Sequence, residues 1–198
     1  RSVVYDRRTQ ALSGENIRDE VKSILSDYLE FVFDDDAGEL ERNGFQSDII
    51  ETLSIDYKGL EPNTSNFQKI KKSILDESDK ILDMKAEMVG QEIFDQFQKF
   101  VIFRTIDQKW KEHLYSMDQL REGINLRAYG QKNPLVEYKQ EGYKMFTDMM
   151  IDTNQETLKR IFRSNISKPD ESQTGRIPKN VNLSHDKMPI DFANPPQS

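Results

Sequence analysis

Cysteine is absent from this 198-residue sequence, and no long apolar run occurs in it. Without cysteine there is no disulfide framework and no thiolate metal site, as suits a reducing compartment. No stretch approaches the ~20 apolar residues that cross a bilayer, and the start does not resemble a signal peptide. A G-x-x-x-x-G-K-[ST] phosphate loop and a Ser-His-Asp or Cys-His set are also missing. We therefore expect no catalytic, cofactor-binding or metal-binding residues and no ATP hydrolysis.

Apolar residues are scarce as well, at 35% of the chain against 32% charged residues, and the net charge is −7. These proportions favour a helical body with a thin core. Residues 13–90 contain 19 acidic and 9 basic side chains, whereas residues 91–165 contain 11 and 12. A nucleic-acid-binding module would have a basic face, so we expect no nucleic-acid partner.

Apolar residues recur at spacings of three and four from Phe103 to Ile124, which predicts an amphipathic helix. If that helix is continuous from Phe94 to Leu126, it is about 50 Å long at ~1.5 Å per residue. A helix with a single apolar stripe needs a partner to cover it. Phe103 begins the stripe, and we predict that the rest of it forms a structural seam with that partner. The predicted seam residues are Ile106, Trp110, Leu114, Met117, Leu120 and Ile124.

A second helix is predicted to begin at Asn133-Pro134, an N-cap residue followed by a proline suited to the first helical position. The connector of residues 125–133 is so short that the two helices form an antiparallel hairpin. Gly142 allows close approach. The expected inward positions of the second helix are Leu135, Tyr138, Phe146, Met149, Leu158 and Ile161.

The turn of this hairpin carries a cluster of apolar, aromatic and basic side chains: Leu126, Arg127, Tyr129 and Lys132. No acidic residue between Glu122 and Glu137 neutralises the two cations. Two interpretations stay open here. The turn is either a binding tip, or Tyr129 packs across the turn while the cations are solvated.

Four further helices are predicted, over residues 1–12, 15–32, 47–53 and 67–90, with residues 58–66 as a loop. Ser13 is the expected N-cap of the helix from Glu15. The last of the four has a stripe formed by Phe67, Ile70, Ile74, Ile81, Met84 and Met88. Gly90 either bends that helix or lies within it, at a cost of ~1 kcal/mol. The predicted fold class is all-α.

Two clusters suggest metal or acid–base chemistry but have simpler interpretations. Asp34, Asp35 and Asp36 are three adjacent carboxylates in a polar loop, which are more often solvated than bound to a divalent cation. His113 lies near Asp107 and Asp118, and a helical histidine in this setting is usually a surface or hydrogen-bonded residue.

The run WKEHLYSMDQLREGINLRAYGQKNP, Trp110 to Pro134, resembles the two-helix finger of SecA, the ATP-driven motor of bacterial preprotein translocation. The family run is close to WKEHL, then MD, LR, GI, LRGYAQKDP and EYK. This sequence departs from it at Ala128 and Gly130, where Gly and Ala are usual, and at Asn133, where Asp is usual. These exchanges are small for small and one capping residue for another, so the tip assignment holds.

The resemblance implies a division into the end of a long scaffold helix (1–12), a small inserted helical wing (13–90), scaffold helices forming the finger (91–165) and a flexible, proline-rich C-terminal linker (166–198). It also implies that the chain, which starts at Arg1, is part of a longer protein. ATP and magnesium would bind in motor domains outside it.

The implied role is to couple ATP hydrolysis in those motor domains to preprotein movement through the SecYEG channel. The implied partners are unfolded preprotein, SecYEG, the motor domains and an anionic phospholipid surface. Dimerisation of the full-length protein is a further implication of the resemblance. Its implied location is cytoplasmic and peripheral to the inner face of the plasma membrane. The alternative is a stand-alone helical adaptor that binds a partner through its apolar stripe.

Overall fold

The computed structural model describes residues 1–13, 16–33, 45–55, 67–124 and 133–166. The chain divides into two compact units, residues 1–167 and 168–198, and all described residues belong to the first. Every regular element in the described residues is a helix, which confirms the all-α class. The finer division into scaffold end, wing, finger and linker stays a prediction.

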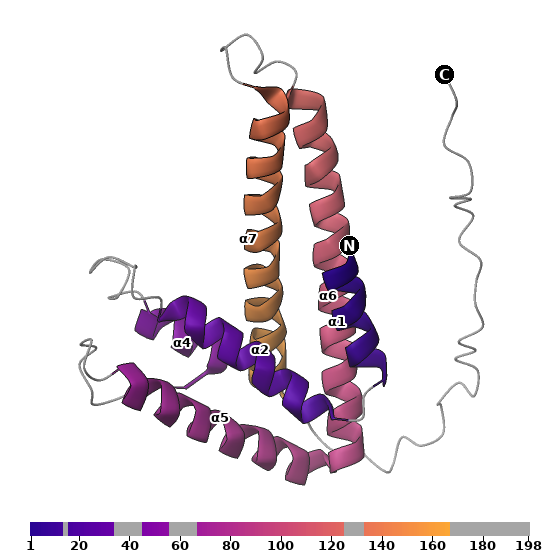
Figure 1. Ribbon diagram of the computed structural model, residues 1–198. Helices are drawn as coiled ribbons and strands as arrows, with labels where there is room; N and C mark the ends of the chain where they lie inside the picture. Colours follow the sequence, from indigo (N-terminus) through magenta and orange to yellow (C-terminus); the bar gives the residue numbers. More distant parts are fainter. Residues whose placement is uncertain (14–15, 34–44, 56–66, 125–132, 167–198) are drawn as a thin grey trace, which may run out of the picture. The chain divides into compact units, whose positions relative to one another are not determined.

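Figure 1 shows two long helices side by side, with four shorter ones around their lower half. The six helices are α1 (Ser2–Ser13), α2 (Ile17–Val32), α4 (Phe45–Leu53), α5 (Phe67–Val89), α6 (Gln91–Ile124) and α7 (Pro134–Arg163).

The long helices α6 and α7 form the predicted antiparallel hairpin. α6 has 34 residues, which gives about 51 Å at ~1.5 Å per residue. α7 begins as its capping residues predict, because the side chain of Asn133 accepts a hydrogen bond from Leu135 N at 3.0 Å and Pro134 occupies the first turn. Local capping chemistry therefore fixes the start of the second arm.

The shorter helices pack against the lower half of the hairpin, which we call the root. α1 lies along α6, α2 and α4 contact α7, and α5 contacts α6.

Gly90, at φ +97°, separates α5 from α6. Its N–H closes α5 on Ala86 O at 2.8 Å, and its carbonyl accepts the first bond of α6 from Phe94 N at 3.0 Å. A glycine relieves the strain of this conformation, so one residue both ends a helix and starts the next.

The hydrophobic core lies at the root and joins residues from all six of the described helices. Its largest fully buried apolar side chains are Leu25, Leu29, Ile49, Leu53, Ile70, Ile74, Leu82, Phe94, Ile102, Leu158 and Ile161. Side-chain ion pairs hold α2 antiparallel to α5, from Arg18 to Asp79 at 3.0 Å and from Lys71 to Glu30 at 3.3 Å. The root is therefore braced on several sides.

The predicted stripe of α5 is wrong in its second half. Met84 and Met88 are 54% and 53% exposed, while Leu82, Ala86 and Val89 are buried. The buried row advances in steps of four from Ile70 through residues 74, 78, 82 and 86. Such a row inclines across the helix surface, as expected for a helix that crosses its neighbours at an angle. The predicted stripe, from Phe67 to Met88, instead assumed a buried face that runs parallel to the helix axis.

The predicted N-cap of α2 is also wrong. Ser13 is the last residue of α1, and Asn16 occupies the N-cap position of α2. The Asn16 side chain makes no capping bond and donates instead to the carboxylate of Asp19.

Candidate functional site

The predicted seam of α6 is buried in part. Ile106, Leu120 and Ile124 are buried, and Trp110 and Met117 are half-buried. Leu114 is 39% exposed, which corrects its assignment to the seam. At 100° per residue, Leu114 lies about 80° around the helix from Ile106, so it borders the seam rather than facing α7.

An aromatic stack fills the middle of the seam. The ring of His113 lies 5.4 Å from the Trp110 ring and 5.9 Å from the Phe146 ring of α7, measured between centroids. Burial lowers the pKa of His113. This histidine packs between rings, as expected for a structural residue.

The described residues contain no group of three or more His, Asp or Glu side chains that could hold a metal ion. Asp34, Asp35 and Asp36 lie outside the described residues.

The side chains of α7 become more exposed from the root toward the N-terminal end of the helix, where the hairpin turns. Met149, Leu158 and Ile161 are buried as predicted, and Tyr138 and Phe146 are half-buried. A Cβ on Gly142 would lie 3.0 Å from Met117 Cε, so the predicted close approach is present. Leu135 is 60% exposed and is not an inward residue. It stands in the first turn of α7, where periodicity does not reveal how far the partner helix extends.

Five polar residues of α6 and α7 are buried at the root, and apolar spacing in the sequence does not reveal them. They are Gln98 and Thr105 of α6 and Thr153, Asn154 and Thr157 of α7. Thr105 donates to Val101 O at 2.8 Å and Thr153 to Met149 O at 2.7 Å, so each hydroxyl bonds to its own helix. Their burial could have been predicted in part, because residues 153 and 157 lie at four-residue steps between Met149 and Ile161 and therefore share their face of α7.

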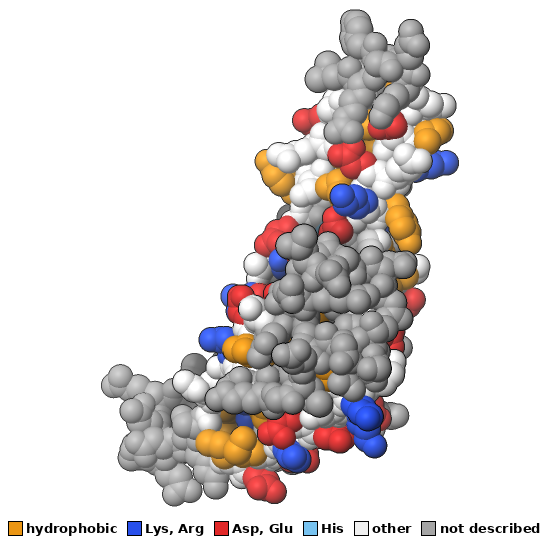
Figure 2. Space-filling model, turned by 90° about the vertical axis from the view of Figure 1, so that its left-hand side faces the viewer, with side chains coloured by type: hydrophobic (Ala, Val, Ile, Leu, Met, Phe, Trp, Pro, Cys, Tyr) orange, Lys and Arg blue, Asp and Glu red, His pale blue; other side chains and the backbone are white. Residues whose placement is uncertain are grey.

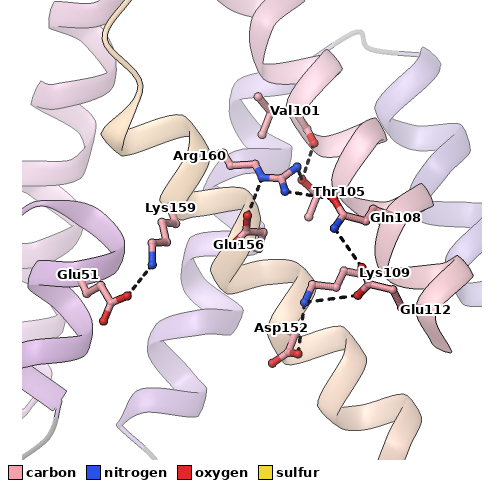
Figure 3. Close-up of polar contacts among 10 residues, drawn as sticks. All are labelled: Glu51, Val101, Thr105, Gln108, Lys109, Glu112, Asp152, Glu156, Lys159 and Arg160. Carbon is pink, nitrogen blue, oxygen red and sulfur yellow. Dashed lines mark hydrogen bonds and ion pairs between the residues drawn. The ribbon is translucent and has the colours of Figure 1, made fainter. Parts of the chain in front are cut away.

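A polar network crosses from α7 to α6 at this level (Figure 3). The Arg160 guanidinium donates to Glu156 Oε1 at 2.7 Å, to Thr105 Oγ1 at 3.3 Å and to Gln108 Oε1 at 3.2 Å. Gln108 in turn donates to Glu112 Oε1 at 3.0 Å. Arg160 thus connects side chains of both helices.

A second cation of this network, Lys109 of α6, reaches across in the opposite direction. Its ammonium lies 3.5 Å from Asp152 Oδ2 of α7 and 3.9 Å from Glu112 Oε2 of its own helix. Both pairs have solvent-exposed carboxylates, so each contributes little stability alone.

Helix α4 is joined to the same part of α7. Lys159 Nζ lies 2.5 Å from Glu51 Oε1, and Arg163 donates to the Glu51 carbonyl at 2.9 Å. Lys159 lowers the pKa of the Glu51 carboxyl. On its other side α4 is seated against α2, where the Tyr28 hydroxyl lies 3.1 Å from Thr52 Oγ1 and burial raises the pKa of Tyr28 to about 12.

Figure 2 shows one face of the molecule, where acidic and basic side chains are interspersed and apolar groups lie singly between them. A uniformly basic strip is not seen among the side chains drawn in colour on this face. The described helices also include none that is long and apolar enough to cross a membrane.

The predicted tip residues Leu126, Arg127, Tyr129 and Lys132 lie outside the described residues, so their assignment stays a prediction. The described arms end at Ile124 and resume at Asn133.

The family described as the SecA Wing and Scaffold domain matches residues 1–165. The chain belongs to this family. The match covers all of the described helices. The resemblance inferred from the run Trp110 to Pro134 is therefore confirmed over most of the chain, and the long hairpin and its root are parts of a SecA wing and scaffold domain.

Curated relatives carry the same family name. The chain is 36% identical over 165 residues to the protein translocase subunit SecA of Chlorobium phaeobacteroides (strain BS1), which is 82% of this chain and 16% of the relative. It is 38% identical over 170 residues to that of Chloroherpeton thalassium, again 82% and 16%. It is 34% identical over 175 residues to that of Chlorobaculum tepidum, 87% and 17%. The chain thus spans about a sixth of the length of these SecA proteins.

Proposed function

We propose that this chain is the non-catalytic scaffold, wing and finger portion of a SecA motor. In this role it couples ATP hydrolysis in motor domains elsewhere in the protein to the movement of preprotein through the SecYEG channel. The observation that carries the proposal is a helical hairpin whose root is braced by four helices and whose outer part, within the described residues, consists of α6 and α7 alone.

Such a hairpin suits mechanical coupling because its two parts differ in packing. The root buries Phe94, Ile102, Leu158 and Ile161 completely, whereas Leu135 at the outer end of α7 is 60% exposed. A movement applied to the braced root is transmitted along rigid helices to the end that carries the turn. Scaffold and finger therefore act as one lever.

The partners of this lever follow from the translocase role. We propose that unfolded preprotein and the SecYEG channel meet the hairpin tip, and that the motor domains of the same polypeptide, with ATP and magnesium, act on the scaffold. An anionic phospholipid surface is a further proposed contact. The full-length protein would work in the cytoplasm and at the inner face of the plasma membrane.

Within the tip, we assign contact with the moving polypeptide to Tyr129 and seating of the finger to Arg127 and Lys132. A translocation tip must hold chains of every sequence. Tyrosine suits this because its rigid ring packs on any apolar group, its hydroxyl bonds to backbone amides and only two torsions are immobilised. The neighbouring cations suit acidic groups on the channel or on phospholipid.

The test uses Tyr129→Ala in the full-length protein. We expect preprotein translocation to fall roughly tenfold or more, which corresponds to about 1.4 kcal/mol, while basal ATP hydrolysis stays unchanged. Tyr129→Phe is the matched control and should retain much of the activity, because it keeps the ring. Translocation by Tyr129→Ala at the native rate would show that the ring only packs the turn.

A further inference from the structure

We propose that Arg160 is a positioning residue that sets the register of α7 against α6 and thereby places the outer end of the hairpin. The inference concerns a specific side chain at the root, more than 25 residues from the turn. Its mechanical consequence rests on the proposed function, but the register itself is a property of this chain that can be measured alone.

Among the residues that the structure describes, no hydrogen bond between two interior side chains of the seam joins α6 to α7 at this level. Thr105 and Thr153 donate to carbonyls of their own helices. Gln98 Nε2 donates to Phe94 O, also in its own helix, at 3.4 Å. Gln98 Oε1 and Thr157 Oγ1 are buried and have no hydrogen-bond partner in the part of the chain that the structure describes. Packed helices can have alternative arrangements, and a directional contact between the helices would favour one of them.

The Arg160 guanidinium supplies hydrogen bonds from α7 to α6. Its Nε is held by Glu156 on its own helix, while Nη1 and Nη2 donate to Thr105 Oγ1 and Gln108 Oε1 of α6 (Figure 3). Thr105 is fully buried and also donates to Val101 O, so its oxygen is a fixed acceptor. A planar fork that meets two acceptors three residues apart fits one relative position of the helices.

The geometry is sensitive to small displacements along the axis. A slide of one residue moves a helix by about 1.5 Å and one turn by about 5.4 Å. A slide of 1.5 Å across hydrogen bonds of 3.2 and 3.3 Å lengthens them to about 3.5 and 3.6 Å and tilts them, which takes them out of hydrogen-bonding range. The Arg160 bonds are therefore made in the observed register and lost in its neighbours.

The other cations nearby do not have this property. Lys109 reaches Asp152 as a point charge at 3.5 Å, which tolerates movement along the axis. Lys159, beside Arg160 in sequence, pairs with Glu51 of α4 and makes no bond to α6 among the described side chains. Lys159 is therefore a matched control for the charge of Arg160 without its bonds across the seam.

Leverage makes the register matter at the turn. The helix rises by 26 residue steps from Pro134 to Arg160, which is about 39 Å at ~1.5 Å per step. A splay of about 5° at the root then moves the outer end by about 3 Å, and an axial slide moves it by the full step. A side chain at the root thus controls where the tip meets its partner.

The experiment exploits the absence of cysteine, which allows two spin labels to be attached without background. Tyr115→Cys on α6 and Tyr143→Cys on α7 place labels at positions that are 66% and 74% exposed. The distance distribution between them is measured by pulsed electron spin resonance in the otherwise unchanged chain, then with Arg160→Gln, Arg160→Lys and Lys159→Gln.

We expect Arg160→Gln to shift or broaden the distribution by 1.5 Å or more, one residue of axial rise. Arg160→Lys, which keeps the charge without the fork, should do so partly, and Lys159→Gln should leave it unchanged. A folded Arg160→Gln chain with the native distribution would overturn the proposal, as would an equal effect of Lys159→Gln. If Arg160→Gln lowers the helical content, Gln108→Leu removes one acceptor at an exposed position and must broaden the distribution.

A translocation assay in the full-length protein separates this inference from the proposed function. If Arg160→Gln changes the distances and lowers translocation with basal ATP hydrolysis intact, both hold. A changed distance with native translocation keeps the register assignment and rejects its mechanical role. An unchanged distance rejects the register assignment, whatever the translocation rate.

Discussion

Trp110 illustrates how partial burial limits what a large side chain contributes. Its ring packs against the core cluster and stacks on His113 at 5.4 Å, yet it remains half-buried. A fully buried tryptophan replaced by alanine costs about 3–5 kcal/mol. We expect Trp110→Ala to lower the free energy of unfolding by about 2 kcal/mol, measured by urea denaturation followed by circular dichroism.

Tyr115 provides the control for Trp110, because it lies on the same helix and is 66% exposed. Tyr115→Ala should change the free energy of unfolding by less than about 0.5 kcal/mol, as is usual for surface positions. Equal losses for the two variants would mean that the aromatic stack adds nothing to the seam.

His113 should make stability depend on pH. Burial lowers its pKa in the folded state below the ordinary value of 6.5, so between these two values the unfolded chain binds more protons than the folded chain. Stability should therefore fall as pH drops through about 6.5, and the fall should level off below the lowered folded pKa.

The measurement compares the native chain with His113→Phe between pH 8 and pH 5.5. We expect the native chain to lose more stability over this range, since the carboxylates are common to both. Identical pH profiles would show that His113 gains no protons on unfolding in this window.

At the scale of elements, the corner between α5 and α6 depends on Gly90. Its φ of +97° is unfavourable for a residue with a Cβ, although a Cβ there would meet no atom within 4 Å. We expect Gly90→Ala to cost about 1–2 kcal/mol in urea denaturation, entirely from backbone strain.

Gly123 is the matched control, since it lies in α6 and also has open space around its Cβ position. Gly123→Ala should stabilise the chain by up to about 1 kcal/mol through helix propensity. A Gly90→Ala variant as stable as the native chain would mean that the corner relaxes without cost.

The sequence predicts helix ends well where the signal is local. Asn133 and Pro134 mark the start of α7 because capping and a fixed proline φ act within one turn. The ends of α6 fall within three residues of the predicted range 94–126, because the apolar spacing that predicts this helix runs along most of its length.

The sequence fails where the answer depends on how helices cross. Met84 and Met88 have apolar spacing but lie on the exposed side of α5, because the direction of the buried row depends on the crossing angle. Thr105, Thr153 and Arg160 escaped notice for a related reason. A polar side chain belongs to a seam only through the partners that another helix presents, and these are tertiary facts.

At the scale of the molecule, the short helices brace the root of the hairpin, and α6 and α7 extend beyond it. On one side of the root, α4 is joined to α7 by polar contacts that include the ion pair of Lys159 with Glu51. On the other side, α1 is joined to α7 by the hydrogen bond from Arg7 to Asn154 at 2.7 Å. The outer arm has none of these supports in the described residues. Its placement therefore depends on the root.

We predict that the chain has no affinity for nucleotide by itself, because its sequence lacks a phosphate-binding motif. Phosphate binding needs a cradle of backbone N–H groups with a lysine, as in a phosphate loop, and the 198-residue sequence contains no such motif. Isothermal titration of the pure chain with magnesium ATP should show no binding heat beyond dilution, whereas the full-length protein should bind. A saturable heat from the chain alone would place a nucleotide site within the wing and scaffold helices and would contradict the assignment of energy transduction to other domains.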